Sequence, residues 1–102
     1  MNEESLPRLL FPYGFDDNIA FEAEMKGVYY HAVVELPNKT RVRVGFYDAV
    51  RVAQDLERGD ICVALPGMII VPKITLDNMI NAVRALGKGD FFVNLQTLME
   101  GD

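Results

Sequence analysis

Apolar and polar positions are arranged most regularly in the middle of the chain, where two neighbouring segments have the character of β-strands. Residues 28–36 are rich in β-branched and aromatic types, and residues 41–47 alternate between apolar and polar positions. Residues 37–40 between them, Pro-Asn-Lys-Thr, are typical of a turn. The pattern therefore predicts a β-hairpin.

The faces of the two strands determine the predicted register of this hairpin, because alternate residues of a strand point to opposite faces. The apolar set consists of Tyr30, Ala32, Val34, Leu36, Val42, Val44 and Phe46. These residues share a face if Leu36 pairs with Val42 or Thr40, which requires an odd number of loop residues. We predict a three-residue or bulged loop in place of a tight two-residue turn.

The opposite face of the hairpin is the candidate functional site. It carries residue types that are enriched at binding hot spots, namely Tyr29, His31, Glu35, Arg41, Arg43 and Tyr47. Cross-strand pairing is expected to set Glu35 against Arg43 and His31 against Tyr47. Three interpretations stay open: a solvated sheet surface with cross-strand pairs, a recognition face, and a catalytic site.

Two segments precede the hairpin. Residues 1–18 carry two prolines and a glycine among large apolar side chains, which argues against a helix or a central strand. We expect an irregular apolar arm that packs on its own domain or on a partner. Residues 19–25 alternate between apolar and polar types, which predicts a half-exposed strand that ends in a bulge or turn at Gly27.

A helical pattern follows the hairpin, with Asp48 as a candidate N-cap and Gly59 as a candidate end. Arg51 and Asp55 are expected on its outer face as an ion pair one turn apart. The inner face is expected to hold the apolar residues spaced i, i+3, i+4 and i+7, namely Ala49, Val52, Ala53 and Leu56.

The rest of the chain predicts further strands and one more helix. Residues 61–65 and 68–71 are apolar at every position, which is typical of strands covered on both faces. A second amphipathic helix is predicted between Thr75, its N-cap, and Gly87. Residues 91–99 are expected to form a last strand.

The order of these elements predicts an α+β fold, with a largely antiparallel sheet of about four to six strands and two helices packed on one face. A length of 102 residues allows one domain. We place this domain at residues 19–102, preceded by the arm at residues 1–18.

Charge and composition narrow the classes of function. Ten basic residues against fifteen acidic ones give a net charge of −5. The basic residues are scattered, which argues against nucleic-acid binding because phosphate contacts supply most of its affinity. No apolar run approaches the ~20 residues of a membrane span, and the acidic N-terminus lacks the pattern of a signal peptide. We expect a cytoplasmic protein that binds neither nucleic acid nor membranes.

The chain offers few reactive residues. Its one serine, Ser5, is close to the N-terminus, and one histidine with one cysteine does not make up the usual zinc-binding sets. Cys62 stands in an apolar run and is expected to be buried as a small hydrophobic residue. Glycines never gather into a phosphate-binding loop. We therefore predict no catalytic residue, no cofactor and no metal.

Residues 36–39, Leu-Pro-Asn-Lys, and residues 46–56, Phe-Tyr-Asp-Ala-Val-Arg-Val-Ala-Gln-Asp-Leu, resemble a pattern in a group of small uncharacterised bacterial proteins. There, a hairpin with a Leu-Pro-Asn/Asp-Gly turn runs into Phe-Tyr-Asp-Pro-x-Arg-Leu and a helix. The resemblance covers residues 28–92, with Lys39 in place of the usual Gly and Ala49 in place of the usual Pro. It implies a hairpin followed by a helix and carries no established activity.

These observations predict a non-enzymatic protein–protein interaction module of the antidote, immunity or regulatory-partner type. It would act through the hairpin face or the apolar arm, on a different protein or in a homodimer. The alternative is a small-ligand-binding domain or small enzyme built around Tyr29, His31, Arg43 and Tyr47. This alternative predicts a concave pocket that holds those four side chains.

Overall fold

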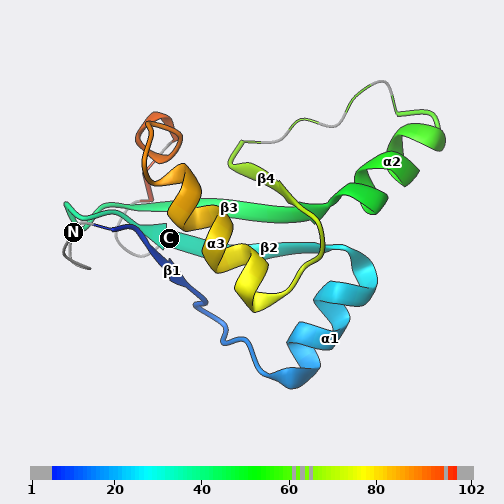
Figure 1. The fold of residues 1–102 in the computed structure, drawn as a ribbon, viewed down its shortest axis with the longest axis horizontal. Helices are drawn as coiled ribbons and strands as arrows, with labels where there is room; N and C mark the ends of the chain where they lie inside the picture. The colour runs from blue at the N-terminus through cyan, green and yellow to red at the C-terminus, as the bar shows by residue number, and fades with distance from the viewer. Residues whose placement is uncertain (1–5, 61, 63, 65, 96, 99–102) are drawn as a thin grey trace.

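The computed structural model describes residues 6–60, 62, 64, 66–95 and 97–98. Its elements, in chain order, are β1 (Arg8–Leu10), α1 (Asp17–Lys26), β2 (Val28–Glu35), β3 (Arg41–Asp48), α2 (Ala49–Glu57), β4 (Met68–Val71), α3 (Leu76–Leu86) and the 3-10 helix η2 (Phe92–Asn94). The strands form one sheet in the order β1-β2-β3-β4. In Figure 1, α3 lies across this sheet, whereas α1 and α2 lie at the end where β2 begins and β3 ends.

The α+β class is confirmed, and the sheet is mixed. β1 pairs with β2 and β2 with β3 in antiparallel fashion, but β4 runs parallel to β3. The pair is parallel because α2 and the segment after it carry the chain back from the end where β3 finishes. β4 therefore starts opposite Gly45 and runs in the same direction as β3. The described residues form three α-helices, one more than expected.

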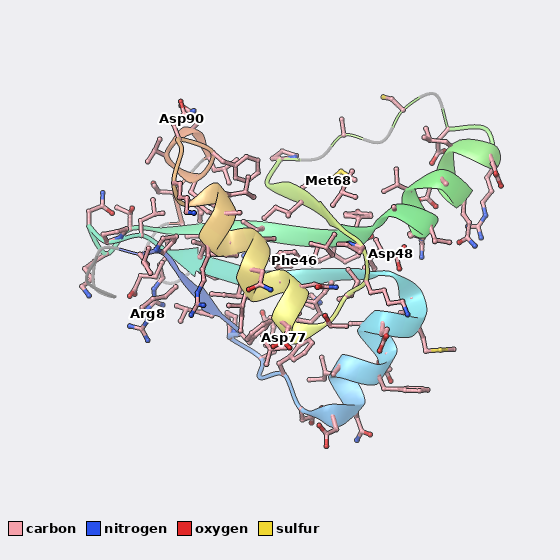
Figure 2. The ribbon with its side chains drawn as sticks, in the orientation of Figure 1. Arg8, Phe46, Asp48, Met68, Asp77 and Asp90 are labelled. Atoms are coloured by element: carbon pink, nitrogen blue, oxygen red, sulfur yellow. The ribbon has the colours of Figure 1, made fainter. Side chains whose placement is uncertain are left out.

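The hydrophobic core lies between the sheet and α3. Phe46 of β3 and Met79 of α3 are fully buried, and Val83 is almost so; Figure 2 shows Phe46 at the position where α3 crosses the sheet. The predicted second helix is confirmed, and the Thr75 side chain caps it by accepting from the Asn78 N–H at 3.2 Å. Each large apolar side chain buried here contributes about 1.5–3 kcal/mol to the free energy of unfolding.

The hairpin and its odd-numbered loop are confirmed. The Leu36 N–H donates to the Thr40 carbonyl at 2.8 Å, and the Lys39 N–H donates to the Leu36 carbonyl at 2.8 Å. Residues 37–39 form the loop, and Lys39 has a left-handed backbone with φ of 73°. Leu36 therefore pairs with Thr40, and Glu35 faces Arg41. The expectation that Glu35 faces Arg43 is wrong because it belongs to the other permitted register.

Residues 19–25 form part of α1, and the predicted strand there is wrong. The Asp16 side chain caps this helix by accepting from the Ile19 N–H at 2.8 Å, and Gly27 ends it in the left-handed conformation with φ of 72°. Ile19 and Ala23, spaced i and i+4, pack against the core, whereas Phe21 is 66% exposed. The alternating pattern was misleading because, of its four apolar residues, only Ile19 and Ala23 pack against the core, whereas Phe21 and Met25 are exposed.

The segments around β4 differ from expectation in several ways. Of residues 61–65, the predicted strand, residues 61, 63 and 65 lie outside the described residues, while Cys62 and Ala64 are exposed and not in a strand. The expectation of a buried Cys62 is therefore wrong. The strand at Met68–Val71 is confirmed, although Ile70 is 56% exposed, so only one of its faces is covered.

Both ends of the chain contain short elements at the sheet margins. Residues 91–99 do not form the expected strand: η2 occupies Phe92–Asn94, and a single bridge joins Thr97 to Val42. Residues 96 and 99 of this predicted strand lie outside the described residues. Within the segment expected to be irregular, Arg8–Leu10 forms the edge strand β1. No helix of the described part of the chain is long and apolar enough to cross a membrane.

Candidate functional site

A β-bulge in β2 divides the predicted site residues between separate places. Between the pairs Ala32–Val44 and Tyr29–Phe46, two residues of β2 stand opposite one residue of β3. The extra residue reverses the face to which the preceding residues point. Tyr29 therefore lies in the core at 6% exposure, whereas Tyr30 is 46% exposed. The predicted faces of these two tyrosines are wrong for this reason.

Gly45 was the signal in the sequence that could have revealed this bulge. It is the residue that stands opposite Tyr30 and His31, and a Cβ built on it would lie 3.7 Å from Cδ1 of Tyr30. Glycine within a strand often marks a bulge or a close approach of another group. His31 does not pair with Tyr47 as expected, because that pair belongs to the same alternative register as Glu35–Arg43; Tyr47 pairs with Val28.

Tyr29 and His31 border a groove between α1 and β2. The His31 ring lies edge-to-face against Tyr13 at 5.3 Å and against Tyr29 at 5.9 Å between ring centroids. The Tyr29 hydroxyl donates to the Gly14 carbonyl at 3.5 Å, and burial raises the pKa of this tyrosine. The open groove measures about 280 Å³ and is lined by Tyr13, Ile19, Glu22, Ala23, Lys26, Val28, Tyr29, Tyr30 and His31.

Tyr47 is a buried residue at the junction of the sheet and α2. It is 4% exposed, and its ring packs edge-to-face against Tyr30 at 5.5 Å. Burial, a side-chain hydrogen bond with Tyr30 and the nearby Asp55 carboxylate raise the pKa of Tyr47 to about 12, although Arg51 acts in the opposite direction. Tyr47 therefore serves as support beneath the exposed Tyr30.

Glu35 and Arg41 form an ion pair near the hairpin loop. The Glu35 Oε2 accepts from Nε of Arg41 at 3.1 Å and lies 3.1 Å from its Nη2, while Oε1 lies 3.6 Å from Nη1 of Arg8. The Glu35 side chain is only 11% exposed, so both arginines shield it from water. Arg43 is exposed and pairs across the ladder with Val33. The predicted site residues are thus found in three groups.

The face of the sheet opposite α3, which we call the open face, has no described helix lying along it. The pairs Leu10–Val33, Val33–Arg43 and Gly45–Met68 place residues of all four strands there. Its surface side chains are Arg8, Leu10, Tyr30, Arg41, Arg43, Met68 and Ile70, of which Ile70 and Tyr30 are 56% and 46% exposed. Val33 and Tyr47, on the same face, are buried. Apolar groups lie in the middle of this face and towards α2, and arginines lie towards the hairpin loop.

Helix α2 is half-buried at Arg51, Val52 and Asp55, and its remaining residues, apolar and polar, are exposed. The Asp48 carboxylate caps it by accepting from the Arg51 N–H at 2.7 Å, and Arg51 also donates from Nη1 to the Lys26 carbonyl at 3.1 Å. The predicted Arg51–Asp55 pair is confirmed at 3.1 Å, with side chains only 33% and 17% exposed. No residue of α2 is buried. Arg51 and Asp55 are therefore half-buried against expectation, and Ala49, Ala53 and Leu56 are exposed against expectation. Gln54, Glu57 and Arg58 are exposed as expected, and Val52 is half-buried.

The exposed apolar side of α2 is extensive for a helix of its length. Val50 is 63% exposed and Leu56 is 43% exposed, and Ala49 and Ala53 are exposed beside them. Figure 1 shows α2 extending beyond the end of β3, away from α3, and Figure 2 places Asp48 at the point where it leaves the sheet. The ties of Arg51 and Asp48 to the end of α1 hold the helix in this direction.

Comparisons with known proteins add no relative to this picture. No model of a known protein family, no curated protein and no solved structure matches the chain. Among the residues that the structure describes, no three or more His, Cys, Asp or Glu side chains form a group suited to a metal ion. The function must therefore be argued from the surfaces described above.

Proposed function

We propose that this protein is a protein–protein interaction module of the antidote, immunity or regulatory-partner type. Its binding surface is the open face together with the apolar side of α2. The observation that carries the proposal is an amphipathic helix with no buried residue, together with a sheet face that no described helix covers and on which Tyr30 and Ile70 are exposed. Exposed apolar side chains that gather on one element mark association sites, because their burial gains about 25 cal/mol per Å².

The residue types on this surface support the proposal. Tyrosine, methionine and arginine are enriched at the centres of protein interfaces, and Tyr30, Met68 and Arg43 stand on three adjacent strands. Tyr30 is held from beneath by Tyr47 at 5.5 Å between ring centroids. A supported aromatic ring loses little conformational freedom on binding, so more of its contact energy appears as affinity.

Site-specific photo-crosslinking in cells of the native source tests this proposal. A photoreactive residue replaces Ile70 on the open face, and the control carries it at Val93 of η2, which is 66% exposed against 56% for Ile70. We expect a protein adduct of discrete mass at position 70, with a yield at least about ten-fold higher than at position 93, because only position 70 lies in the proposed contact. Adducts of equal yield at the two positions would contradict the proposal.

Small-ligand binding is a second candidate, favoured by the groove between α1 and β2. The groove holds Tyr29 and His31 of the expected set, but Arg43 and Tyr47 are not among its lining residues. A volume of about 280 Å³ suits a small aromatic or heterocyclic molecule. Fragment titration followed by nuclear magnetic resonance would move the His31 and Tyr13 signals selectively. Shifts spread evenly over the surface would contradict ligand binding there.

A further inference from the structure

We infer that the partner of this surface is a second copy of the same chain, with α2 of each copy lying on the open face of the other. This inference rests on the proposed interaction function and specifies its partner. Among the described residues, the chain carries both halves of such a contact: a helix whose Val50 and Leu56 are exposed, and a sheet face on which Tyr30 and Ile70 are exposed and no helix lies.

The connection between β3 and β4 explains why the two surfaces are complementary. In a strand–helix–strand crossover, the helix normally packs on the sheet that its flanking strands form. Here β3 and β4 are adjacent and parallel, but the helix between them extends past the end of β3 (Figure 1). If two copies exchange their α2 helices, each sheet is covered by the α2 of the other copy. The apolar residues of the helix and of the sheet are then both buried.

The dimensions of the two elements are compatible with this exchange. Helix α2 has nine residues and is about 13 Å long at ~1.5 Å per residue. Strand β3 has eight residues and spans about 26 Å at ~3.3 Å per residue. The partner helix therefore fits within the length of the open face. A two-fold axis makes both contacts identical, so each copy gives one helix and receives one.

The charges at the two ends set the direction of the partner helix. Glu57 and Asp60, at the end of α2 and just beyond it, are exposed, and Arg43 is exposed on the open face towards the hairpin loop. None of these three belongs to an ion pair within the described residues. A helix that enters near Ile70 and runs towards the loop sets its apolar residues on the apolar part of the face. Glu57 and Asp60 outnumber the exposed Arg58 between them, so this end of the helix carries a net negative charge and meets Arg43. Such complementarity favours one orientation.

Solution mass of the purified full chain is the first test. We expect a species of twice the 11.5 kDa chain mass by light scattering at micromolar concentration. Val50→Asp and Leu56→Asp are expected to give monomers, because each places a carboxylate in the apolar contact. Val93→Asp is the matched control, since Val93 and Val50 are 66% and 63% exposed, and it should stay dimeric. Circular dichroism checks that each variant is folded.

Two results of this experiment would overturn the inference. One is a wild-type chain that is monomeric at every concentration. The other is a dimer that the aspartate substitutions in α2 leave as tight as the Val93→Asp control. If the chain is monomeric while position 70 still crosslinks to a different protein, the inference fails and the proposed interaction function stands.

Charge exchange tests the direction of the helix. Arg43→Glu alone and Glu57→Arg alone are each expected to weaken the dimer about ten-fold or more, as charge pairs at interfaces commonly do. The double variant, with both changes in one chain, should regain most of the lost affinity because it restores the pair in the opposite sense. A double variant weaker than either single variant would overturn the proposed orientation.

Discussion

Helices α2 and α3 have the same apolar spacing and the same kind of N-cap, yet they differ in what covers them. Thr75 caps α3 and Asp48 caps α2, each through a side-chain oxygen that accepts from the N–H three residues later. α3 buries Met79 and Val83 against the sheet, whereas α2 buries nothing. The difference teaches that periodicity predicts a helix and its apolar side, but another element must be present to cover that side.

The reason for the difference lies at the start of each helix. Before α3, the buried Ile74 anchors the chain on the core, so the helix begins over the sheet. Before α2, polar contacts with the end of α1 set the direction: the Asp48 N–H donates to the Gly27 carbonyl at 2.9 Å, and Arg51 binds the Lys26 carbonyl. These contacts turn Arg51 and Asp55 inward, while Glu57 and Arg58 stay exposed.

Truncation of one apolar side chain in each helix should give the largest contrast. We expect Met79→Ala in α3 to lower the free energy of unfolding by about 2–5 kcal/mol, because it opens a cavity in a close-packed core. Leu56→Ala in α2, measured in solution dilute enough to keep the chain monomeric, should cost less than about 1 kcal/mol. Urea denaturation measures both, and equal losses would show that α2 is packed within its own chain.

A side chain added at Gly27, where the end of α1 closely approaches the cap of α2, should have the next largest effect on stability. Gly27→Ala forces a Cβ to within 2.7 Å of Oδ2 of Asp48 at a φ of 72°, and we expect a loss of about 2–4 kcal/mol. Gly14→Ala is the matched control, since its φ is 80° and nothing lies within 4 Å. It should cost only the backbone term of about 1–2 kcal/mol. If the two variants lose the same stability, the contact does not position α2.

Alkaline unfolding should report the junction of α2 with the sheet. The folded-state pKa of Tyr47 is raised to about 12 from the ordinary 10.0, so between these values the unfolded chain binds fewer protons than the folded chain. This contribution to stability is complete below pH 10 and is lost as the pH rises towards 12. Tyr47→Phe should reduce the decline, measured by urea denaturation at several pH values. A decline unchanged by this substitution would assign it to other groups.

The caps of the two helices should give a smaller contrast. Thr75→Ala and Asp48→Ala each remove one side-chain acceptor of a backbone N–H, and we expect losses of about 0.5–2 kcal/mol. Loss of the cap of α3 should lower global stability because that helix covers the core. Loss of the Asp48 cap should appear chiefly as faster amide exchange in α2, measured by nuclear magnetic resonance, and unchanged exchange there would contradict this prediction.

Local patterns in the sequence were sufficient for several parts of the fold. The hairpin, its odd-numbered loop, the caps of α2 and α3, and the Arg51–Asp55 pair were all predictable, because each depends on residues within a few positions of one another. The strand predicted at residues 19–25 shows the limit of this reasoning. Alternation and helical spacing share the i, i+4 positions. Asp16 and Gly27 decide between them: Asp16 is the N-cap of a helix, and Gly27, expected as the bulge or turn after a strand, is its C-cap.

For the candidate site, the sequence by itself determined which residues are aromatic, charged or apolar, and which strand or helix most of them occupy. The tertiary structure decided which of them share a surface. One extra residue at the bulge opposite Gly45 sends Tyr29 into the core and exposes Tyr30, and contacts with α1 turn the apolar side of α2 to water. Burial is a relation between segments far apart in the chain, so no local period of the sequence contains it.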